Sequence, residues 1–195
     1  MTILPNPNGS HTTGILKDDV FPTPRNPAAS SYALSDTARQ ALGLLRIAFG
    51  LTFLWAFVDK LFGFGYATKS GDSWLNGGSP TEGFLKFGAK GPFKSFYNSI
   101  AGDMWVNVLF MVALLAIGVA LTLGIGMRLA GVGGTLLYIM MWTVAMPPEN
   151  NPVLDEHLLG AISIAVLSLT LAGNTLGLGH LWINTSLVKK FPVLR

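Results

Sequence analysis

Long apolar stretches dominate the pattern of hydrophobic and polar positions along the chain. They cover roughly residues 40–62, 103–125, 127–146 and 152–173. A helix needs about 20 predominantly apolar residues to cross the hydrocarbon core of a bilayer, and each stretch has about this length. The pattern therefore predicts an all-α integral membrane protein, built as a four-helix bundle with a long loop between its first and second helices.

Helix-breaking residues mark the ends of the last two stretches. Pro147 and Pro148 follow the third stretch and should end its helix. Asn151 precedes the fourth, where we expect it to cap the helix with Pro152 in the first turn. The second and third stretches almost touch in the sequence, so we expect them to form an antiparallel hairpin.

Small residues recur at every fourth position on both sides of that tight turn. They are Ala116, Ala120 and Gly124 on the second stretch, and Gly126, Ala130 and Gly134 on the third. Such stripes let membrane helices approach closely, which predicts tight packing within the hairpin. The alternative is that these residues reflect the general abundance of glycine in membrane helices.

Three segments follow from composition. Residues 1–38 are rich in Pro, Asn, Ser and Thr and are predicted to be a disordered cytoplasmic tail. Residues 39–183 form the predicted transmembrane domain, and residues 184–195 a basic cytoplasmic C-terminal tail.

The distribution of Lys and Arg predicts the orientation in the cell membrane. Arg39, Arg128 and the C-terminal Lys189 and Lys190 fall on one side, whereas the loop between the third and fourth stretches carries only acids. The positive-inside rule then places both termini in the cytoplasm. The lysines of the loop 63–102 oppose this assignment, but long loops carry less weight.

Composition excludes several kinds of chemistry. The chain is 50% hydrophobic and 12% charged, and it has no cysteine, which excludes disulfides and thiolate-bound metal or iron–sulfur clusters. Its three histidines are dispersed, and no haem, flavin or metal motif is seen. The chain has no run of basic residues that would indicate a nucleic-acid partner.

The long first loop contains an amphipathic segment, PFKSFYNSI. Its apolar residues Phe93, Phe96, Tyr97 and Ile100 have helical spacing. The segment is therefore expected either to lie at the headgroups as a lid over the bundle or to be a packed connection.

Ionisable residues also occur inside or at the ends of the predicted spans. Arg46 lies about two turns into the first span, where it either serves function or extends to the headgroups. Asp59 and Lys60 near the other end of this span either mark the membrane interface or contribute to a site.

Three adjacent titratable residues, Asp155, Glu156 and His157, begin the fourth span. Acids in the first turn complement the helix dipole, which accounts for Asp155 and Glu156. His157 has no such explanation, and an imidazole beside a carboxylate at a membrane surface suits proton exchange with a quinone headgroup. The alternative is a hydrogen-bonded interfacial histidine.

Two stretches carry a family resemblance. LRIAFGLTFLWAFVDKLFG resembles the opening helix of the DoxX/DoxD family of small four-helix membrane proteins. NPVLDEHLLGAISIAVLSLTLAGNTLGLGHLW resembles the last helix and exit of the DoxD branch, the membrane subunit of thiosulfate:quinone oxidoreductase. The resemblance implies electron transfer from thiosulfate, giving tetrathionate, to a quinone as acceptor. It also implies a second, DoxA-like subunit supplied by a separate protein.

Together these inferences give one functional hypothesis. Quinone enters between the helices, Asp155, Glu156 and His157 exchange protons, and Arg46 braces the interior or stabilises charge. Asp59, Lys60, Trp105 and Trp142 are the candidate quinone-binding residues, and Lys86, Lys90 and Lys94 would attract a dianionic sulfur substrate. The alternatives are a non-catalytic anchor for a redox partner and, less favoured, a transporter; a homo-oligomer is left open.

Overall fold

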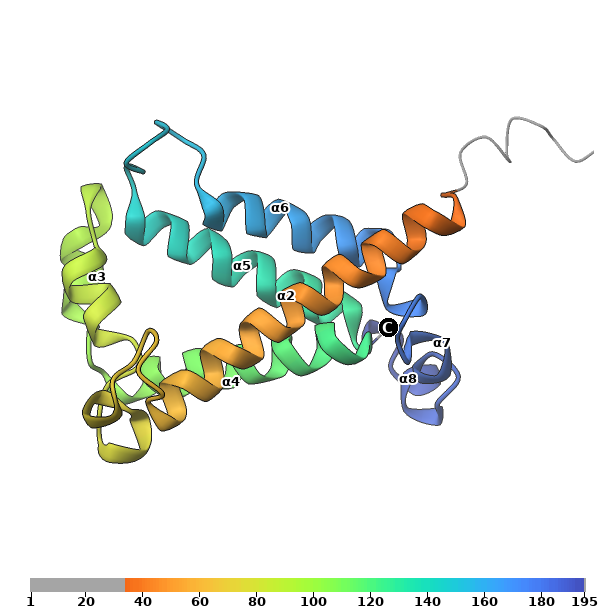
Figure 1. Cartoon of the computed structure of the whole chain (residues 1–195), viewed down its shortest axis with the longest axis horizontal. Coiled ribbons are helices and arrows are strands. Elements are labelled where there is room, and N and C mark those ends of the chain that lie inside the picture. Colours follow the sequence, from red (N-terminus) through yellow and green to blue (C-terminus); the bar gives the residue numbers. More distant parts are fainter. Residues whose placement is uncertain (1–33, 195) are drawn as a thin grey trace, which may run out of the picture. The chain divides into compact units, whose positions relative to one another are not determined.

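The computed structural model of the chain describes residues 34–194. This part is helical and contains no strand (Figure 1), which confirms the all-α prediction for the described residues. The predicted N-terminal tail lies outside them, except that its last residues, Asp36 to Ala38, already belong to the first long helix.

Long helices account for most of the described residues. They are α2 (Asp36–Phe62), α4 (Met104–Leu123), α5 (Met127–Ala145) and α6 (Glu156–Leu169). Shorter helices follow or connect them: α3 (Lys94–Ser99), α7 (Gly179–Trp182) and α8 (Ser186–Lys190). Single turns complete the connections: η1 (Ser70–Asp72), η2 (Trp74–Asn76), η3 (Phe84–Gly88), η4 (Gly91–Phe93), η5 (Ala172–Asn174) and η6 (Pro192–Leu194).

Three helices, α2, α4 and α5, are long and apolar enough to cross a membrane. The fourth, α6, is apolar but has only 14 residues. Large hydrophobic side chains are exposed along all four helices, among them Leu51, Leu109, Leu136 and Ile162. Exposure of this kind is expected of helices surrounded by lipid, and it makes a bilayer the natural environment of this chain.

The start of α6 differs from the prediction. Asp155, not Asn151, is the N-cap, because its carboxylate accepts a hydrogen bond from the backbone N–H of Leu158 at 2.9 Å. The Asn151 side chain instead accepts the backbone N–H groups of Val153 and Leu154. It therefore stabilises a turn that precedes the helix, and its predicted capping role is wrong. The end of α5 at Ala145, just before the two prolines, is as predicted.

The long helices approach one another most closely at glycines that mostly lie outside the predicted stripes. The most extensive contacts pair α2 with α4 and α5 with α6, whereas the contact between α4 and α5 is smaller. A Cβ atom on Gly118 would lie 2.8 Å from the Leu54 side chain, so α2 and α4 meet there at glycine distance. Gly134 of the predicted stripe packs against Ile164 of α6, but Ala116 is exposed. The stripes therefore do not make the hairpin the tightest contact.

The four long helices run antiparallel to their neighbours along the chain and define two ends (Figure 1). We call the end where α2 begins, and where α7 and α8 lie, the Arg46 end. The other end carries residues 63–103 and 146–155, and we call it the loop end.

The amphipathic segment of the first loop is packed on one side and exposed on the other. Tyr97 of α3 is buried against Leu85 and Val144, and its hydroxyl lies 2.5 Å from Thr143 Oγ1. Phe93 and Phe96 are exposed. The segment thus shows the features expected of a packed connection, with aromatic rings left on its outer side.

Residues 184–194 are folded onto the Arg46 end. Val188 is fully buried, and Arg128 at the start of α5 donates a hydrogen bond to the carbonyl of Pro192 at 3.3 Å. The indole of Trp182 donates to the carbonyl of Leu194 at 2.6 Å. The segment predicted as a basic tail is therefore part of the packed structure.

Candidate site at the loop end

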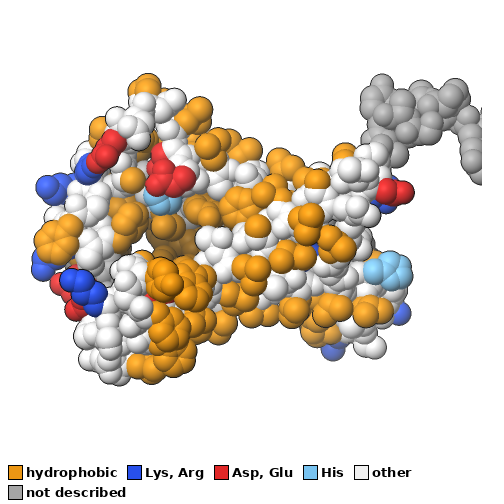
Figure 2. Space-filling view, viewed as in Figure 1, with side chains coloured by type: hydrophobic (Ala, Val, Ile, Leu, Met, Phe, Trp, Pro, Cys, Tyr) orange, Lys and Arg blue, Asp and Glu red, His pale blue; other side chains and the backbone are white. Residues whose placement is uncertain are grey.

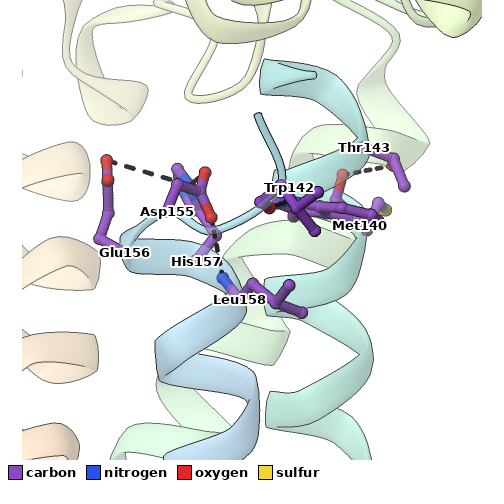
Figure 3. A network of polar contacts seen from close by, with 8 residues as sticks. Met140, Trp142, Thr143, Asp155, Glu156, His157 and Leu158 are labelled. Atoms are coloured by element: carbon purple, nitrogen blue, oxygen red, sulfur yellow. Dashed lines mark hydrogen bonds and ion pairs between the residues drawn. The ribbon is translucent and has the colours of Figure 1, made fainter. Parts of the chain in front are cut away.

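Asp155 and His157 form a hydrogen-bonded pair at the start of α6 (Figure 3). The His157 Nδ1 atom lies 2.8 Å from Asp155 Oδ2, while Asp155 Oδ1 caps the helix through Leu158. The side chains of His157 and Asp155 are 13% and 9% exposed. Glu156 is far more exposed than this pair, with a side chain that is 85% exposed and a carboxylate oxygen 4.0 Å from His157 Nδ1. Asp155 and His157 thus form the organised part of the predicted triplet.

The environment of Asp155 favours its charged form. Burial raises the pKa of its carboxyl, but the hydrogen bonds from the Leu158 N–H and from His157, with the charge of His157, outweigh burial and hold the pKa below its ordinary value. The carboxylate therefore remains ionised at neutral pH and orients the imidazole. One ligand atom from each residue of the triplet lies within 4.8 Å of the others, close enough for a cation. Because Glu156 is exposed, the hydrogen-bonded pair of Asp155 and His157 is better defined than a cation site formed by all three residues.

Two aromatic rings flank the His157 imidazole. Phe84 from η3 and Tyr138 from α5 each have ring centroids 6.3 Å from that of His157. Tyr138 in turn contacts Phe49 and Phe53 of α2 edge to face. The pair is thereby held between the first loop and the hydrophobic core, and Phe84 is its neighbour on the loop side.

An apolar cavity of about 480 Å³ lies between α4, α5 and the first loop. Its walls include Trp105, Leu109, Phe110, Leu137 and Met141. A volume of this size accommodates a small organic ring system with part of an aliphatic chain. Trp105, predicted as a quinone-binding residue, therefore lines a cavity of suitable character.

A polar cleft of about 970 Å³ lies next to this cavity in the first loop. Its walls include Thr68, Lys69, Asp72, Glu82 and Asn107. Figure 2 shows a hollow in the surface at this end, close to acidic and histidine side chains. Lys60, Pro80 and Phe84 line both the polar cleft and the apolar cavity, so these residues form a wall common to the two.

Lys60 and Asp59, adjacent in the sequence, have different surroundings. Asp59 is 1% exposed, and its Oδ2 accepts the backbone N–H groups of Ala67 and Thr68 at 3.0 and 2.9 Å. Asp59 thus fixes the start of the loop. Its Oδ1 is buried and has no hydrogen-bond partner among the described residues. Lys60 is half-buried and faces the two cavities.

Trp142, the remaining predicted quinone-binding residue, does not line either cavity. Its indole donates a hydrogen bond to the carbonyl of Val153 at 2.8 Å, which ties α5 to the segment preceding α6. Trp142 therefore supports the position of the Asp155–His157 pair from outside.

Arg46 lies at the opposite end of the helices and is not brought together with Asp155 and His157. It is fully buried and does not extend to the surface. Its guanidinium donates to backbone carbonyls at the end of α4 and after α6: Leu121, Thr122, Ala172, Thr175 and Leu176. These contacts favour a role for Arg46 in bracing the interior, because its guanidinium donates to carbonyls at helix ends, where partners within the helix run out.

Several residues of the loop end were not singled out from the sequence. Asn107 of α4 accepts hydrogen bonds from Ser79 Oγ, Thr81 N and Thr81 Oγ1 and so fixes Pro80 between them. The signal available was an amide inside an apolar helix, which is costly unless it is satisfied. Phe84 and Tyr138 gave no signal, because aromatic residues are common in such sequences.

The three lysines expected to attract an anion are not grouped. Lys86 pairs with Glu82 at 3.3 Å and Lys90 with Glu149 at 2.8 Å, while Lys94 is exposed on α3. The hydrogen bond and charge of Lys90 hold the pKa of Glu149 below its ordinary value. The first two lysines therefore have acidic partners already.

Comparisons of the chain with protein-family models, with curated proteins and with solved structures found no match.

Proposed function

We propose that this chain is the quinone-binding membrane component of a quinone-linked oxidoreductase. The observation that carries the proposal is the apolar cavity with Lys60 in its wall, directly beside a polar cleft. A quinone likewise combines an apolar body with polar groups, because its two carbonyl oxygens accept hydrogen bonds. The ammonium of Lys60 supplies a donor for one of these oxygens at the polar side of the cavity.

Thiosulfate is the electron donor that the sequence resemblance implies. In the proposed reaction, two thiosulfate anions each lose one electron and join through a new S–S bond to give tetrathionate. The quinone accepts these two electrons together with two protons and becomes quinol. The Asp155–His157 pair is placed to exchange protons with water at this end, and Phe84 lies between the pair and the cavities.

The proposed membrane arrangement is a four-span bundle in the cell membrane, with α6 as the fourth span. The Arg46 end carries Arg39, Arg128, Lys189 and Lys190 against one acid, Asp36. At the loop end the lysines of the connections all lie in the long first loop, which carries less weight, and the short connection between α5 and α6 has neither Lys nor Arg. This asymmetry supports a cytoplasmic Arg46 end and an outward-facing loop end. Asp155, Glu156 and His157 then face the outer water layer.

A second candidate function is a membrane anchor for a separate redox subunit. It is favoured by an exposed aromatic cluster at the loop end, in which Trp55 stacks on Phe64 and contacts Tyr66 edge to face. Figure 2 shows hydrophobic side chains gathered beside the loop at this end. Such a surface suits either headgroups or a partner protein.

The test measures thiosulfate-dependent reduction of a soluble quinone analogue by membranes from cells making this chain and cells lacking it. Ala113→Phe fills the apolar cavity, and Ala116→Phe on the same helix adds the same ring outside it. The proposal predicts activity that Ala113→Phe abolishes and Ala116→Phe retains. Activity that requires an added partner and survives Ala113→Phe would instead support the anchor function.

A further inference from the structure

An apolar groove of about 640 Å³ lies between α4 and α5, in the half of these helices that is nearest the Arg46 end. Trp182 and Leu194 from the folded C-terminal segment form part of its wall. Four members of the small-residue stripes also line it: Ala116, Ala120, Gly126 and Ala130. Because their side chains are short, these residues leave a space between the two helices instead of bringing the helices into close contact.

The groove has about the depth of one membrane leaflet. Its residues extend from Val112 to Ala120 on α4 and as far as Gly133 on α5. At a rise of 1.5 Å per residue, the span on α4 is about 12 Å, close to the roughly 15 Å that one leaflet contributes to the hydrocarbon core. None of the lining side chains is charged. The groove therefore suits an aliphatic chain of the leaflet at the Arg46 end.

Arg128 lies at the Arg46 end of this groove. It is exposed and stands in the sequence between Gly126 and Leu129, which both line the groove. Its guanidinium donates one hydrogen bond, to the carbonyl of Pro192 at 3.3 Å, and pairs with no carboxylate within residues 34–194. A guanidinium has five N–H donors, so Arg128 retains donors for a ligand such as a phosphate group.

Two lysines add to this positive charge, and no acid of the neighbouring elements offsets it. Lys189 and Lys190 are exposed at the end of α8, directly before the turn η6 that carries Leu194 to the groove. Residues 104–148 and 157–195, which include every residue of the groove lining, contain no Asp or Glu. The groove thus combines an apolar lining with an excess of positive charge at one end.

We propose that this groove binds one anionic phospholipid, with an acyl chain between α4 and α5 and its phosphate beside Arg128, Lys189 and Lys190. The apolar lining selects an aliphatic chain, and the three cations favour an anionic headgroup over a zwitterionic one. The groove meets the apolar cavity of the loop end at Ala113 and Gly133. The cations lie at the opposite end of the groove, where an uncharged quinone would make no use of them.

Trp182 allows the groove to be followed directly, because it belongs to the wall. The experiment uses the full chain in a maltoside detergent, with Trp182 as the only tryptophan. Phosphatidylglycerol and phosphatidylcholine with identical brominated acyl chains are titrated separately, since bromine quenches an indole at short range. A second form of the chain retains only Trp105, which lies outside the groove.

The lipid site predicts saturable quenching of Trp182 by phosphatidylglycerol, with an affinity about tenfold or more above that of phosphatidylcholine. Added sodium chloride should reduce this preference, because salt screens the attraction between the phosphate and exposed cations. Trp105 should show only weak, non-saturating quenching with either lipid.

Substitutions at the two parts of the site should have different effects. Arg128→Gln and Lys190→Gln should each weaken phosphatidylglycerol binding about fivefold and leave phosphatidylcholine unaffected. Lys94→Gln is the matched control, an exposed lysine at the loop end. Ala116→Phe fills the groove and should abolish saturable quenching by both lipids. Val108→Phe adds the same ring to an exposed position of α4 outside the groove and should leave binding unchanged.

Four results would overturn the inference. Equal affinity for the two lipids would show that the groove does not select a headgroup. Equal, non-saturating quenching of Trp182 and Trp105 would show that the lipids merely mix with the detergent. Saturable quenching of Trp182 by a short-chain quinone that displaces phosphatidylglycerol would assign the groove to the quinone. A dimer in lipid-free detergent that Ala116→Phe dissociates, measured by light scattering, would assign the groove to a second copy of the chain.

Discussion

The two ends of the helices both hold a charged side chain of α2 within the protein, but in opposite ways. At the Arg46 end the guanidinium is enclosed, and its hydrogen-bond acceptors are all backbone carbonyls. At the loop end the Lys60 ammonium faces two cavities and lacks a partner among the described residues. The two surroundings distinguish a charge satisfied by the protein from one that is left able to donate to a bound molecule.

Glycines are crowded at both ends, but the open ones gather in the first loop. At the Arg46 end Gly124, Gly173, Gly177 and Gly179 are so close to other backbone atoms that a Cβ would lie within 3 Å of them, and Gly126 is open. At the loop end a Cβ on Gly63, Gly78 or Gly91 would also lie within 3 Å of backbone atoms, whereas Gly65, Gly71, Gly77 and Gly83 have nothing within 4 Å. The glycines of AGNTLGLGHLW, part of the family resemblance, therefore serve packing around Arg46, and the open glycines of the loop shape its surface.

The largest expected effect comes from Arg46. Arg46→Leu removes five hydrogen bonds to backbone carbonyls, of which that to Leu121 is buried and those to Thr122, Thr175 and Leu176 are partly buried, while the Ala172 carbonyl keeps the Thr175 N–H. At roughly 1–3 kcal/mol for an unsatisfied buried carbonyl and less for a partly buried one, we expect the free energy of unfolding to fall by about 3 kcal/mol. Thermal denaturation in detergent measures this. The control is Arg128→Leu, which removes an exposed guanidinium with one bond to Pro192 and should change stability little. Equal losses in the two variants would contradict the structural role.

Gly124 and Gly126 give the next comparison, because both have positive φ and only Gly124 is crowded. A Cβ on Gly124 would lie 2.7 Å from the Gly173 carbonyl oxygen, whereas Gly126 has open space. Gly124→Ala should therefore destabilise by roughly 1–3 kcal/mol beyond the loss in Gly126→Ala. The two thermal transitions are compared directly, and coincident transitions would show that the backbone is not closely packed there.

At the loop end, Asn107→Leu tests whether Asn107 holds the segment around Pro80 in place. It preserves the side-chain size but leaves Thr81 N–H and two hydroxyls without their acceptor, at an expected cost of roughly 1–3 kcal/mol. Hydrogen exchange should accelerate in residues 79–82 and not in segment 172–176. Unchanged exchange at 79–82 would mean that Asn107 does not hold the wall.

The smallest effect is expected at Asp155. Asp155→Ala removes the N-cap of α6 and should cost about 1 kcal/mol at neutral pH, whereas Asp155→Asn keeps an acceptor and should cost less. Because the folded state holds the pKa of Asp155 below its ordinary value, the stabilisation from its charge is present above about pH 4 and is lost as the pH falls through the folded pKa. Unfolding of wild type and Asp155→Asn should therefore converge in acid; a difference that grows in acid would contradict this assignment.

The sequence predicted the helices better than it predicted the site. Hydropathy located α2, α4 and α5 because apolar length is a local property of the chain. The start of α6 was misplaced because Asn151 and Asp155 are both acceptable caps, and only the course of the preceding turn decides between them. Which glycines meet a neighbouring helix depends on rotation about each helix axis, which the spacing of small residues does not fix.

Of the candidate site, the sequence predicted the proximity of Asp155 and His157, because they are near neighbours in the chain; their role in proton exchange stays a prediction. The placement of Lys60 between two cavities depends on the path of residues 63–103, whose irregular turns have no periodic pattern. The order of the predicted spans already implied that Arg46, near the start of the first span, and His157, at the start of the fourth, lie at opposite ends. The antiparallel order of the spans separates them.

The most direct test of the account is quinone binding observed at Trp105. A short-chain quinone is titrated into two variants of the full chain in detergent, one retaining only Trp105 and the other only Trp182, which lies by an apolar groove at the Arg46 end. Binding of a quinone in the apolar cavity should give saturable quenching of Trp105 that Ala113→Phe abolishes, and only weak, non-saturating quenching of Trp182. Equal and non-saturating quenching of both would show that the quinone merely partitions into the apolar phase, and would contradict a binding site at the loop end.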